Sequence, residues 1–122
     1  MRNLVRGLAL GRIAFGALML VKPEETMRGW IGSRPASYGG TQAVTRGLGA
    51  RDLSLGAGAL SALIAGNDAR DWVLAGAFGD VGDFVATATA EDLPLSGRLL
   101  VFGLAGAAIA VSVGYLTSTG ES

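Results

Sequence analysis

The chain has 122 residues and a mass of 12.3 kDa, which fits one domain and excludes a multidomain enzyme with separate cofactor and substrate halves. Hydrophobic residues make up 50% and charged residues only 16%, against roughly 25% in an ordinary soluble domain, so the composition is typical of a membrane protein. The net charge of zero argues against nucleic acid as a partner. Because Cys and His are both absent, the usual zinc, iron–sulfur and haem ligands are missing, and we expect no metal site and no cofactor.

The first apolar segment, at about residues 3–21, predicts a transmembrane helix with Arg6 near its start and Arg12 in its interior. A cleaved signal peptide is the other interpretation of such a segment. We reject it, because Arg12 splits the apolar stretch and no small-x-small cleavage site follows before Lys22.

The stretch from residue 22 to residue 41 predicts a short interfacial helix between spans 1 and 2. Pro23 suits the first turn of this helix and Gly32 suits its end. Its apolar face, at helical spacing, consists of Met27, Trp30 and Ile31. Residues 33–40 are interpreted as a flexible loop that leads into the second span.

Three further apolar segments, at about residues 41–65, 70–90 and 97–117, complete four predicted spans. The last segment is uncharged from Leu99 to Leu116 and is apolar on all sides. A soluble four-helix bundle, the alternative, needs a solvated face on every helix. We therefore predict an all-α fold: an integral membrane four-helix bundle that forms a single four-span domain over residues 1–122. Its predicted location is the cell membrane, which it crosses several times in contact with the lipid bilayer.

Small residues on the fourth span predict close helix packing. Gly106, Ala110 and Gly114 are spaced by four and form a ridge that suits contact with another helix of the same chain. A homodimer or a membrane protein partner that packs on this ridge is the alternative. The Lys and Arg residues at the two sides of the predicted bundle are nearly balanced, so the orientation stays open.

Six ionisable residues lie inside the predicted spans, three of each sign. They are Arg12, Arg46, Arg51, Asp52, Asp80 and Asp83. An isolated charge at the bilayer centre costs at least roughly 2.5 kcal/mol, so these side chains are expected to face the interior and pair. At about 1.5 Å of rise per residue, Arg46 and Asp83 should form one shallow layer, and the other four a layer near the midplane.

One face of the third span is small and polar. At spacings of three and four it carries Trp72, Gly76, Gly79, Asp80, Asp83 and Thr87. We expect this face to line the interior of the bundle.

Several motifs together resemble one family of membrane proteins. They are Leu10-Gly11-Arg12, Pro23 after the first span, the run from Arg46 to Gly56 with its Arg51-Asp52 pair, and the acidic third helix with Asp80 and Asp83. Over about residues 4–116 the chain is similar to small bacterial four-helix membrane proteins related to the DoxX-like group. The resemblance implies a four-helix membrane fold without an established reaction, and it marks Arg51, Asp52 and Asp83 as the positions that matter most.

Three functions fit a buried Arg/Asp network in such a protein. A balanced network can satisfy itself without a ligand, which favours an accessory or assembly protein of the membrane. The first alternative is a membrane-embedded enzyme or binding protein for a small lipid-soluble molecule. There Asp52 with Asp80 or Asp83 would divide the roles of acid and base around Arg51. The second alternative is a small proton-coupled transporter. A closed network favours the structural role, whereas a cavity with an unpaired carboxylate oxygen favours a ligand.

Overall fold

The computed structural model describes residues 1–118, and these residues form helices and connections without a strand. The helices are α1 (Arg2–Val21), α2 (Pro23–Ile31), α3 (Ser33–Ala36), α4 (Gly39–Ile64), α5 (Arg70–Thr89) and α6 (Leu95–Thr117). The all-α prediction is confirmed, and the four long helices cover the four apolar segments of the sequence.

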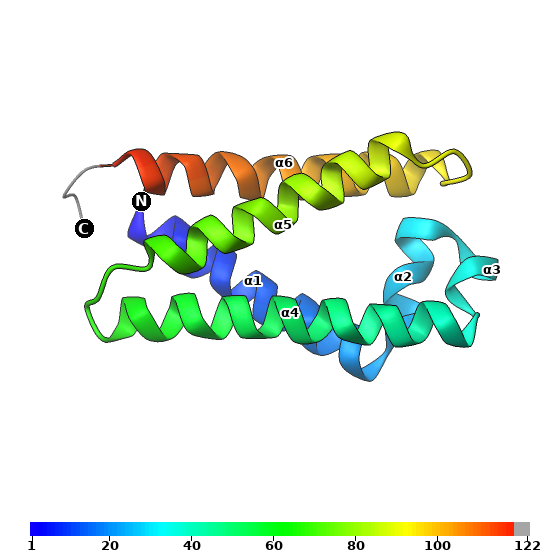
Figure 1. Ribbon diagram of the computed structural model, residues 1–122, viewed down its shortest axis with the longest axis horizontal. Helices are drawn as coiled ribbons and strands as arrows, with labels where there is room; N and C mark the ends of the chain where they lie inside the picture. The colour runs from blue at the N-terminus through cyan, green and yellow to red at the C-terminus, as the bar shows by residue number, and fades with distance from the viewer. Residues whose placement is uncertain (119–122) are drawn as a thin grey trace.

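The four long helices lie side by side as two antiparallel pairs (Figure 1). Most contacts of α1 are with α4 and most contacts of α5 are with α6, while contacts between the two pairs are fewer. The N-terminus, the last turn of α6 and the α4–α5 connection lie at one end of the bundle, here called end A. Helices α2 and α3 and the α5–α6 connection lie at the opposite end, here called end B.

Glycines allow α1 and α4 to approach closely. A Cβ atom added at Gly16 would lie 2.6 Å from the carbonyl oxygen of Gly49, and one added at Gly56 would lie 2.6 Å from the carbonyl oxygen of Ala9. These distances are shorter than any ordinary contact, so the two backbones touch where the side chains are absent. The pair α1–α4 is therefore packed through glycine rather than through interlocking large side chains.

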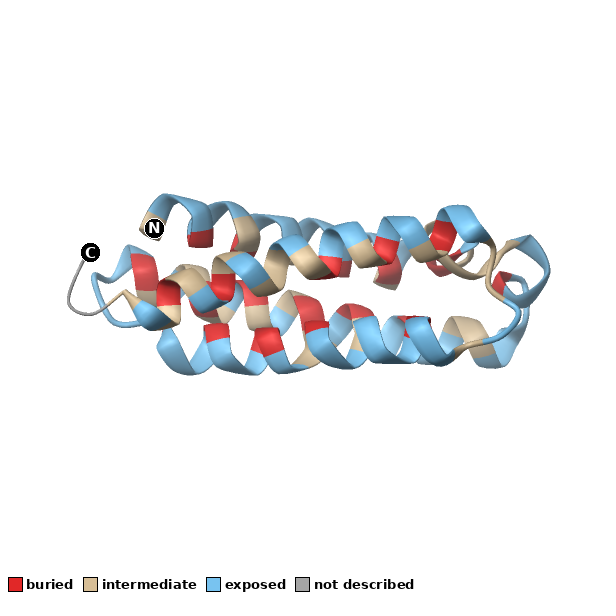
Figure 2. Ribbon diagram, turned by 90° about the horizontal axis from the view of Figure 1, so that it is seen from above, coloured by how far each residue is buried: buried red, intermediate tan, exposed pale blue. Residues whose placement is uncertain are grey.

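Each end of the bundle holds a small apolar cluster. The cluster at end A consists of Val5, Leu63, Ala69, Val73 and Tyr115, and the cluster at end B of Met19, Met27 and Ala36. Figure 2 shows that the buried residues form thin strips along the inner faces of the helices, while most of the outer surface is exposed. The middle of the bundle, between the two clusters, is where the charged side chains meet.

Helix α2 closes end B, where it contacts α1, α4 and α6. Pro23 occupies its first position, and Gly32 ends it at a φ of 96°, a left-handed conformation that favours glycine. The indole Nε1 of Trp30 donates a hydrogen bond to the hydroxyl oxygen of Thr87 on α5, at 3.1 Å. Because Gly97 has no side chain, α6 can lie directly against the backbone of Trp30. A helix after the first span was predicted correctly.

The prediction of a flexible loop over residues 33–40 is wrong. This segment contains the short helix α3, and α4 already begins at Gly39. The turn at Gly32 reverses the chain, and the side chain of Ala36 is then fully buried against Met19 and Met27. Small and polar residues suggested a loop, but one buried methyl group at the right position holds the segment in place.

The ridge predicted on α6 does not pack within the chain at Gly106 and Ala110, although Gly114 lies against Met1. Packing of this ridge on a homodimer or a membrane protein partner stays a prediction. The buried residues of α6 form a different stripe, which consists of Gly97, Val101, Ala105, Ser112 and Tyr115. No heavy atom of the described residues comes within 4 Å of a Cβ added at Gly106, and Ala110 is exposed. A helix that is apolar on all sides has no polar face to mark which side turns outward, so its inward stripe could not be read from periodicity.

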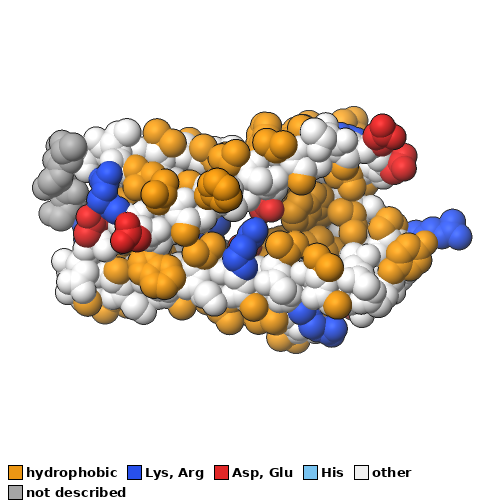
Figure 3. Space-filling view, in the orientation of Figure 1, with side chains coloured by type: hydrophobic (Ala, Val, Ile, Leu, Met, Phe, Trp, Pro, Cys, Tyr) orange, Lys and Arg blue, Asp and Glu red, His pale blue; other side chains and the backbone are white. Residues whose placement is uncertain are grey.

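Large apolar side chains lie on the outside of the long helices, while charged side chains are seen at the two ends and also along the middle of the bundle (Figure 3). Phe78 on α5 is 83% exposed, and Leu4, Val44 and Leu99 on the other long helices are more than half exposed. By length and composition, α1 and α6 could each cross a membrane. The charges of the bundle interior lie on α4 and α5, apart from Arg12 on α1.

Candidate functional site

A two-point ion pair joins α1 to α5 in the middle of the bundle. The guanidinium of Arg12 donates from Nη1 to Asp80 Oδ1 at 3.0 Å and from Nη2 to Asp80 Oδ2 at 2.6 Å. The two side chains are only 11% and 9% exposed. This end-on arrangement satisfies both carboxylate oxygens and is the strongest geometry available to an Arg–Asp pair.

A second group of charges lies between α4 and α5 and is held together by Arg51. Its Nη2 atom donates to Asp52 Oδ1 at 3.1 Å and to Asp83 Oδ2 at 3.3 Å. The side chain of Arg51 is 35% exposed, so this group is less deeply enclosed than the Arg12–Asp80 pair. One arginine is thus flanked by two carboxylates, the arrangement that the sequence suggested for acid–base chemistry.

Glycines on α5 make room for both guanidinium groups. A Cβ atom added at Gly76 would lie 2.8 Å from Nη2 of Arg12, and one added at Gly79 would lie 3.4 Å from Cζ of Arg51. The predicted inward face of the third span is therefore confirmed at these two glycines, at the two aspartates of the network and at the buried Thr87. The glycines leave room beside α5 for the two guanidinium groups. The aspartates one turn further along the helix then pair with them.

Arg46 does not join the network, and the predicted layer of Arg46 with Asp83 is wrong. Its side chain is exposed and its Nε atom donates to the carbonyl oxygen of Leu20 at 3.3 Å, at the end of α1. Asp83 pairs with Arg51 instead. Counting helical rise ignored the length of the arginine side chain, which lets Arg51 reach Asp83 and lets Arg46 reach toward the end of the bundle.

The departure of Arg46 changes the charge balance of the interior. Arg12 and Arg51 face Asp52, Asp80 and Asp83, so two positive groups meet three negative ones when all are ionised. The sequence suggested a neutral set of three against three. The structure leaves one carboxylate in excess.

Two carboxylate oxygens of the network accept no hydrogen bond from the described residues. They are Oδ2 of Asp52 and Oδ1 of Asp83. Among the described residues, every fully enclosed polar side-chain atom has a partner, so these two oxygens must keep some access to open space. Asp52 is nevertheless only 8% exposed, which means that its free oxygen faces the interior rather than the surface.

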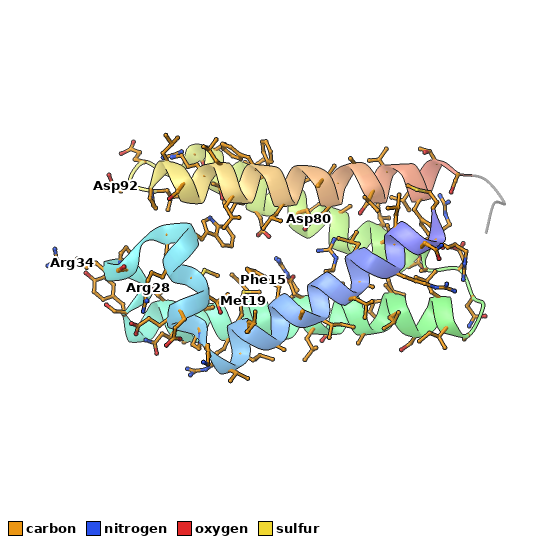
Figure 4. The ribbon with its side chains drawn as sticks, turned by 180° about the vertical axis from the view of Figure 1, so that it is seen from behind. Phe15, Met19, Arg28, Arg34, Asp80 and Asp92 are labelled. Atoms are coloured by element: carbon orange, nitrogen blue, oxygen red, sulfur yellow. The ribbon has the colours of Figure 1, made fainter. Side chains whose placement is uncertain are left out.

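A cavity of about 450 Å³ reaches the network from the side of the bundle. Its charged lining consists of Arg12, Asp52, Asp80 and Asp83, and its walls are apolar side chains of α1 and α6. Leu4 on α1 and Leu104 on α6 are both more than half exposed and both line it, so the cavity opens along the seam between these two helices. Figure 4 views this side, with Asp80 in the space between α6 and α1.

Helix α2 closes one end of the cavity. Thr26 and Trp30 contribute to its lining there, and Phe15 lines it from α1. Trp30 also borders a second space of about 450 Å³, under α2 and beside α4, whose lining is almost entirely apolar. The indole therefore separates a charged cavity from an apolar groove.

Three arginines outside the network cap the ends of long helices. Arg46 donates to the carbonyl oxygen of Leu20 on α1, and Arg2 donates to that of Leu63 on α4. Arg98 donates to the carbonyl oxygens of Thr87, Ala90 and Glu91 at the end of α5. A positive side chain at the negative end of a helix is favourable, and each of these comes from another helix. These caps were not predicted from the sequence, in which Arg2 and Arg98 were assigned to the two sides of the bundle and Arg46 to the interior network.

The site offers carboxylates and guanidinium groups, but no metal cage. Among the described residues, no three acidic side chains lie close enough together to hold a metal ion. What the arrangement can do is bind a polar group against the free oxygens of Asp52 and Asp83, and exchange a proton with it. Comparison with protein-family models, curated proteins and solved structures finds no match to this chain.

Proposed function

We propose that the chain is a multi-pass membrane protein that binds a small lipid-soluble molecule in the cavity between α1 and α6. The observation that carries this proposal is the position of the cavity. It opens between the two helices whose length and composition suit a membrane, and it is lined by Asp52 and Asp83, each with an oxygen that accepts no hydrogen bond from residues 1–118. A molecule dissolved in lipid could enter it from the side.

The distribution of side chains supports a membrane location. Apolar side chains point outward from all four long helices, while the charges of the middle region point inward and pair. At about 1.5 Å per residue, the 26 residues of α4 and the 20 residues of α5 would also cover a hydrocarbon core of about 30 Å. The DoxX-like resemblance would agree with four spans. In this setting α2 lies near the membrane interface on end B, with its apolar face turned onto the bundle, where Met27 is buried.

The structural role applies to only part of the network. Arg12 and Asp80 satisfy one another, as expected of a pair that sets how α1 and α5 align. Asp52 and Asp83 share one guanidinium nitrogen and keep an oxygen each for another partner. An accessory protein needs only the first pair, so the second group favours a ligand-binding role.

A membrane-embedded enzyme is the second candidate, and the Asp52–Arg51–Asp83 arrangement favours it. Two carboxylates on one arginine can divide into a proton acceptor and a proton donor, while the cation steadies negative charge on the bound molecule. Loss of turnover with unchanged binding in Asp83→Asn would distinguish this candidate from a binding protein.

Photolabelling tests the proposed cavity. The protein, reconstituted in nanodiscs, is irradiated with octanol that carries a diazirine, and the labelled residues are mapped by mass spectrometry. We expect labelling on the facing sides of α1 and α6, and about a tenfold decrease in Gly11→Leu, because Gly11 lines the cavity and has open space at its Cβ position for a larger side chain.

Gly82→Leu is the matched control for this experiment. Gly82 is an exposed helical glycine with open space around it, as Gly11 is, but it does not line the cavity. Its labelling pattern should equal that of the unaltered protein. Uniform labelling around the outside of the bundle, unaffected by Gly11→Leu, would overturn the proposal.

A further inference from the structure

We infer that the molecule bound between α1 and α6 is a lipid-soluble amine, which enters as a protonated ammonium group on a hydrocarbon body. The inference rests on the proposed function and names the chemical class of the ligand. Three observations lead to it: the charge balance of the interior, the free oxygens of two aspartates, and the apolar walls of the cavity.

The charge balance calls for a cation. Arg12 and Arg51 together offset two of the three carboxylates, and the charged lining of the cavity itself consists of three aspartates and one arginine. A carboxylate without a counter-charge is costly in a region of low dielectric constant, so one positive group of the ligand would remove the imbalance.

The hydrogen-bonding pattern calls for a donor. Oδ2 of Asp52 and Oδ1 of Asp83 accept nothing from the described residues, while Oδ1 of Asp52 and Oδ2 of Asp83 are both held by Arg51. An ammonium group has three N–H donors and no acceptor, and it is therefore matched to two free carboxylate oxygens. The side chain of Asp52 is only 12% exposed, and Asp52 lines the cavity, which gives a ligand access to its carboxylate.

The walls call for an organic cation rather than a metal ion. The described residues hold no group of three acidic side chains that could form a metal cage. Leu8 and Phe15 on α1 and Leu100 and Leu104 on α6 instead line the passage to the carboxylates. The volume of about 450 Å³ falls within the range of roughly 300 to 1,000 Å³ that small organic ligands occupy.

Binding of four matched probes to the protein in nanodiscs tests the inference. Tritiated octylamine is the reporter, and octanol, octanoate and octyltrimethylammonium compete with it, with empty nanodiscs as the background. We expect saturable binding of octylamine, and competition by octanol or octanoate that is at least about tenfold weaker. Octyltrimethylammonium carries the positive charge without an N–H donor. Its affinity should therefore lie between that of octylamine and those of octanol and octanoate.

Two variants connect this binding to the aspartates. Asp52→Asn and Asp83→Asn should each weaken octylamine binding by about tenfold or more, because each removes a charge-assisted acceptor. The side chain of Asp83 is 26% exposed and thus less enclosed than that of Asp52. If Asp52→Asn does not fold, Asp83→Asn still tests whether the aspartates bind the amine. Asp71→Asn, an exposed aspartate in the first turn of α5, is the control and should leave binding unchanged.

The outcomes separate this inference from the proposed function. If octanol displaces octylamine equally well while Gly11→Leu still blocks photolabelling, the cavity binds ligands but the excess carboxylate carries a proton, and the amine inference is wrong. If octanoate is preferred, the arginines set the specificity and the inference is again wrong. If none of the four probes binds saturably and the seam is not labelled, both the amine inference and the proposed function fail.

Discussion

Arg12 and Asp80 face each other across the bundle with two nearly parallel hydrogen bonds, of 3.0 and 2.6 Å, and this contact is the main polar link between the α1–α4 pair and the α5–α6 pair. The pair sits beside the cavity and forms part of its lining. Its removal should therefore affect how the two helix pairs dock as well as how the cavity is shaped.

Replacing one member of this pair should destabilise the protein strongly. Arg12→Ala leaves the Asp80 carboxylate enclosed without a partner, and we expect a loss of about 3 to 5 kcal/mol in the free energy of unfolding. Unfolding in mixed micelles with increasing SDS measures it. The double variant Arg12→Leu/Asp80→Leu should recover most of the loss, since an apolar pair leaves no unpaired charge.

The exposed pair of Arg28 and Glu24 on α2 is the control. Its N–O distance is 3.7 Å and both side chains are open to solvent, so Arg28→Ala should change the free energy of unfolding by about 1 kcal/mol or less. Equal losses in Arg12→Ala and Arg28→Ala would show that the inner pair has no special role.

Glycine substitutions should separate the close α1–α4 contact from the open surface. In Gly56→Ala the new methyl group would meet the carbonyl oxygen of Ala9 at 2.6 Å, and we expect a loss of about 1 to 3 kcal/mol from the separated helices. Gly47→Ala, on the same helix but facing open space, should be neutral or stabilising by up to about 1 kcal/mol. Parallel SDS unfolding of the two variants is the measurement. A loss in Gly47→Ala as large as that in Gly56→Ala would contradict the packing described for this pair.

Thiol labelling should decide how many helices cross the bilayer. The chain has no cysteine, so single cysteines at Ser33, Asn67 and Glu91 can be labelled one at a time with a membrane-impermeant maleimide in sealed vesicles. With four spans, the positions at Ser33 and Glu91 react from one side and that at Asn67 from the other, because α4 and α5 separate them. If only α1 and α6 cross, all three positions react from the same side.

Removal of the arginine cap on α5 should loosen the end of that helix. Arg98→Ala deletes hydrogen bonds to the carbonyl oxygens of Thr87, Ala90 and Glu91, and we expect a loss of about 1 to 3 kcal/mol in the free energy of unfolding. Amide hydrogen exchange over residues 86–96 should increase. Arg34→Ala, an exposed arginine on α3, should leave exchange in that segment unchanged, and an equal effect there would argue against a specific cap.

The helical fold could be predicted well from the sequence, because apolar runs of this length are interrupted by clear stop signals such as Lys22-Pro23 and Glu91-Asp92-Leu93-Pro94. The inward face of α5 was also predictable. Its small residues and carboxylates recur at helical spacing. When the two faces of a helix differ in this way, the sequence predicts which face turns toward the interior.

The faces of α4 and α6 and the partner of each arginine could not be predicted. The residues of α6 are apolar on every side of the helix. No pattern in the sequence therefore distinguishes the buried stripe that contains Val101 and Ala105. Arg46 and Arg51 carry the same side chain one and a half turns apart on α4, yet one caps α1 and the other holds two aspartates. That choice depends on which carbonyl or carboxylate lies within reach, which only the packed helices define.

The two helix pairs carry opposite net charges within the network, which favours their assembly in the order of synthesis. Arg12, Arg51 and Asp52 belong to the hairpin of α1 and α4, which is synthesised first, while Asp80 and Asp83 belong to the hairpin of α5 and α6. The early hairpin thus holds a surplus of one positive charge until the late hairpin, with two negative charges, arrives. Attraction between these opposite charges would guide the late hairpin onto the early one, and the early hairpin alone would keep one arginine without a counter-charge.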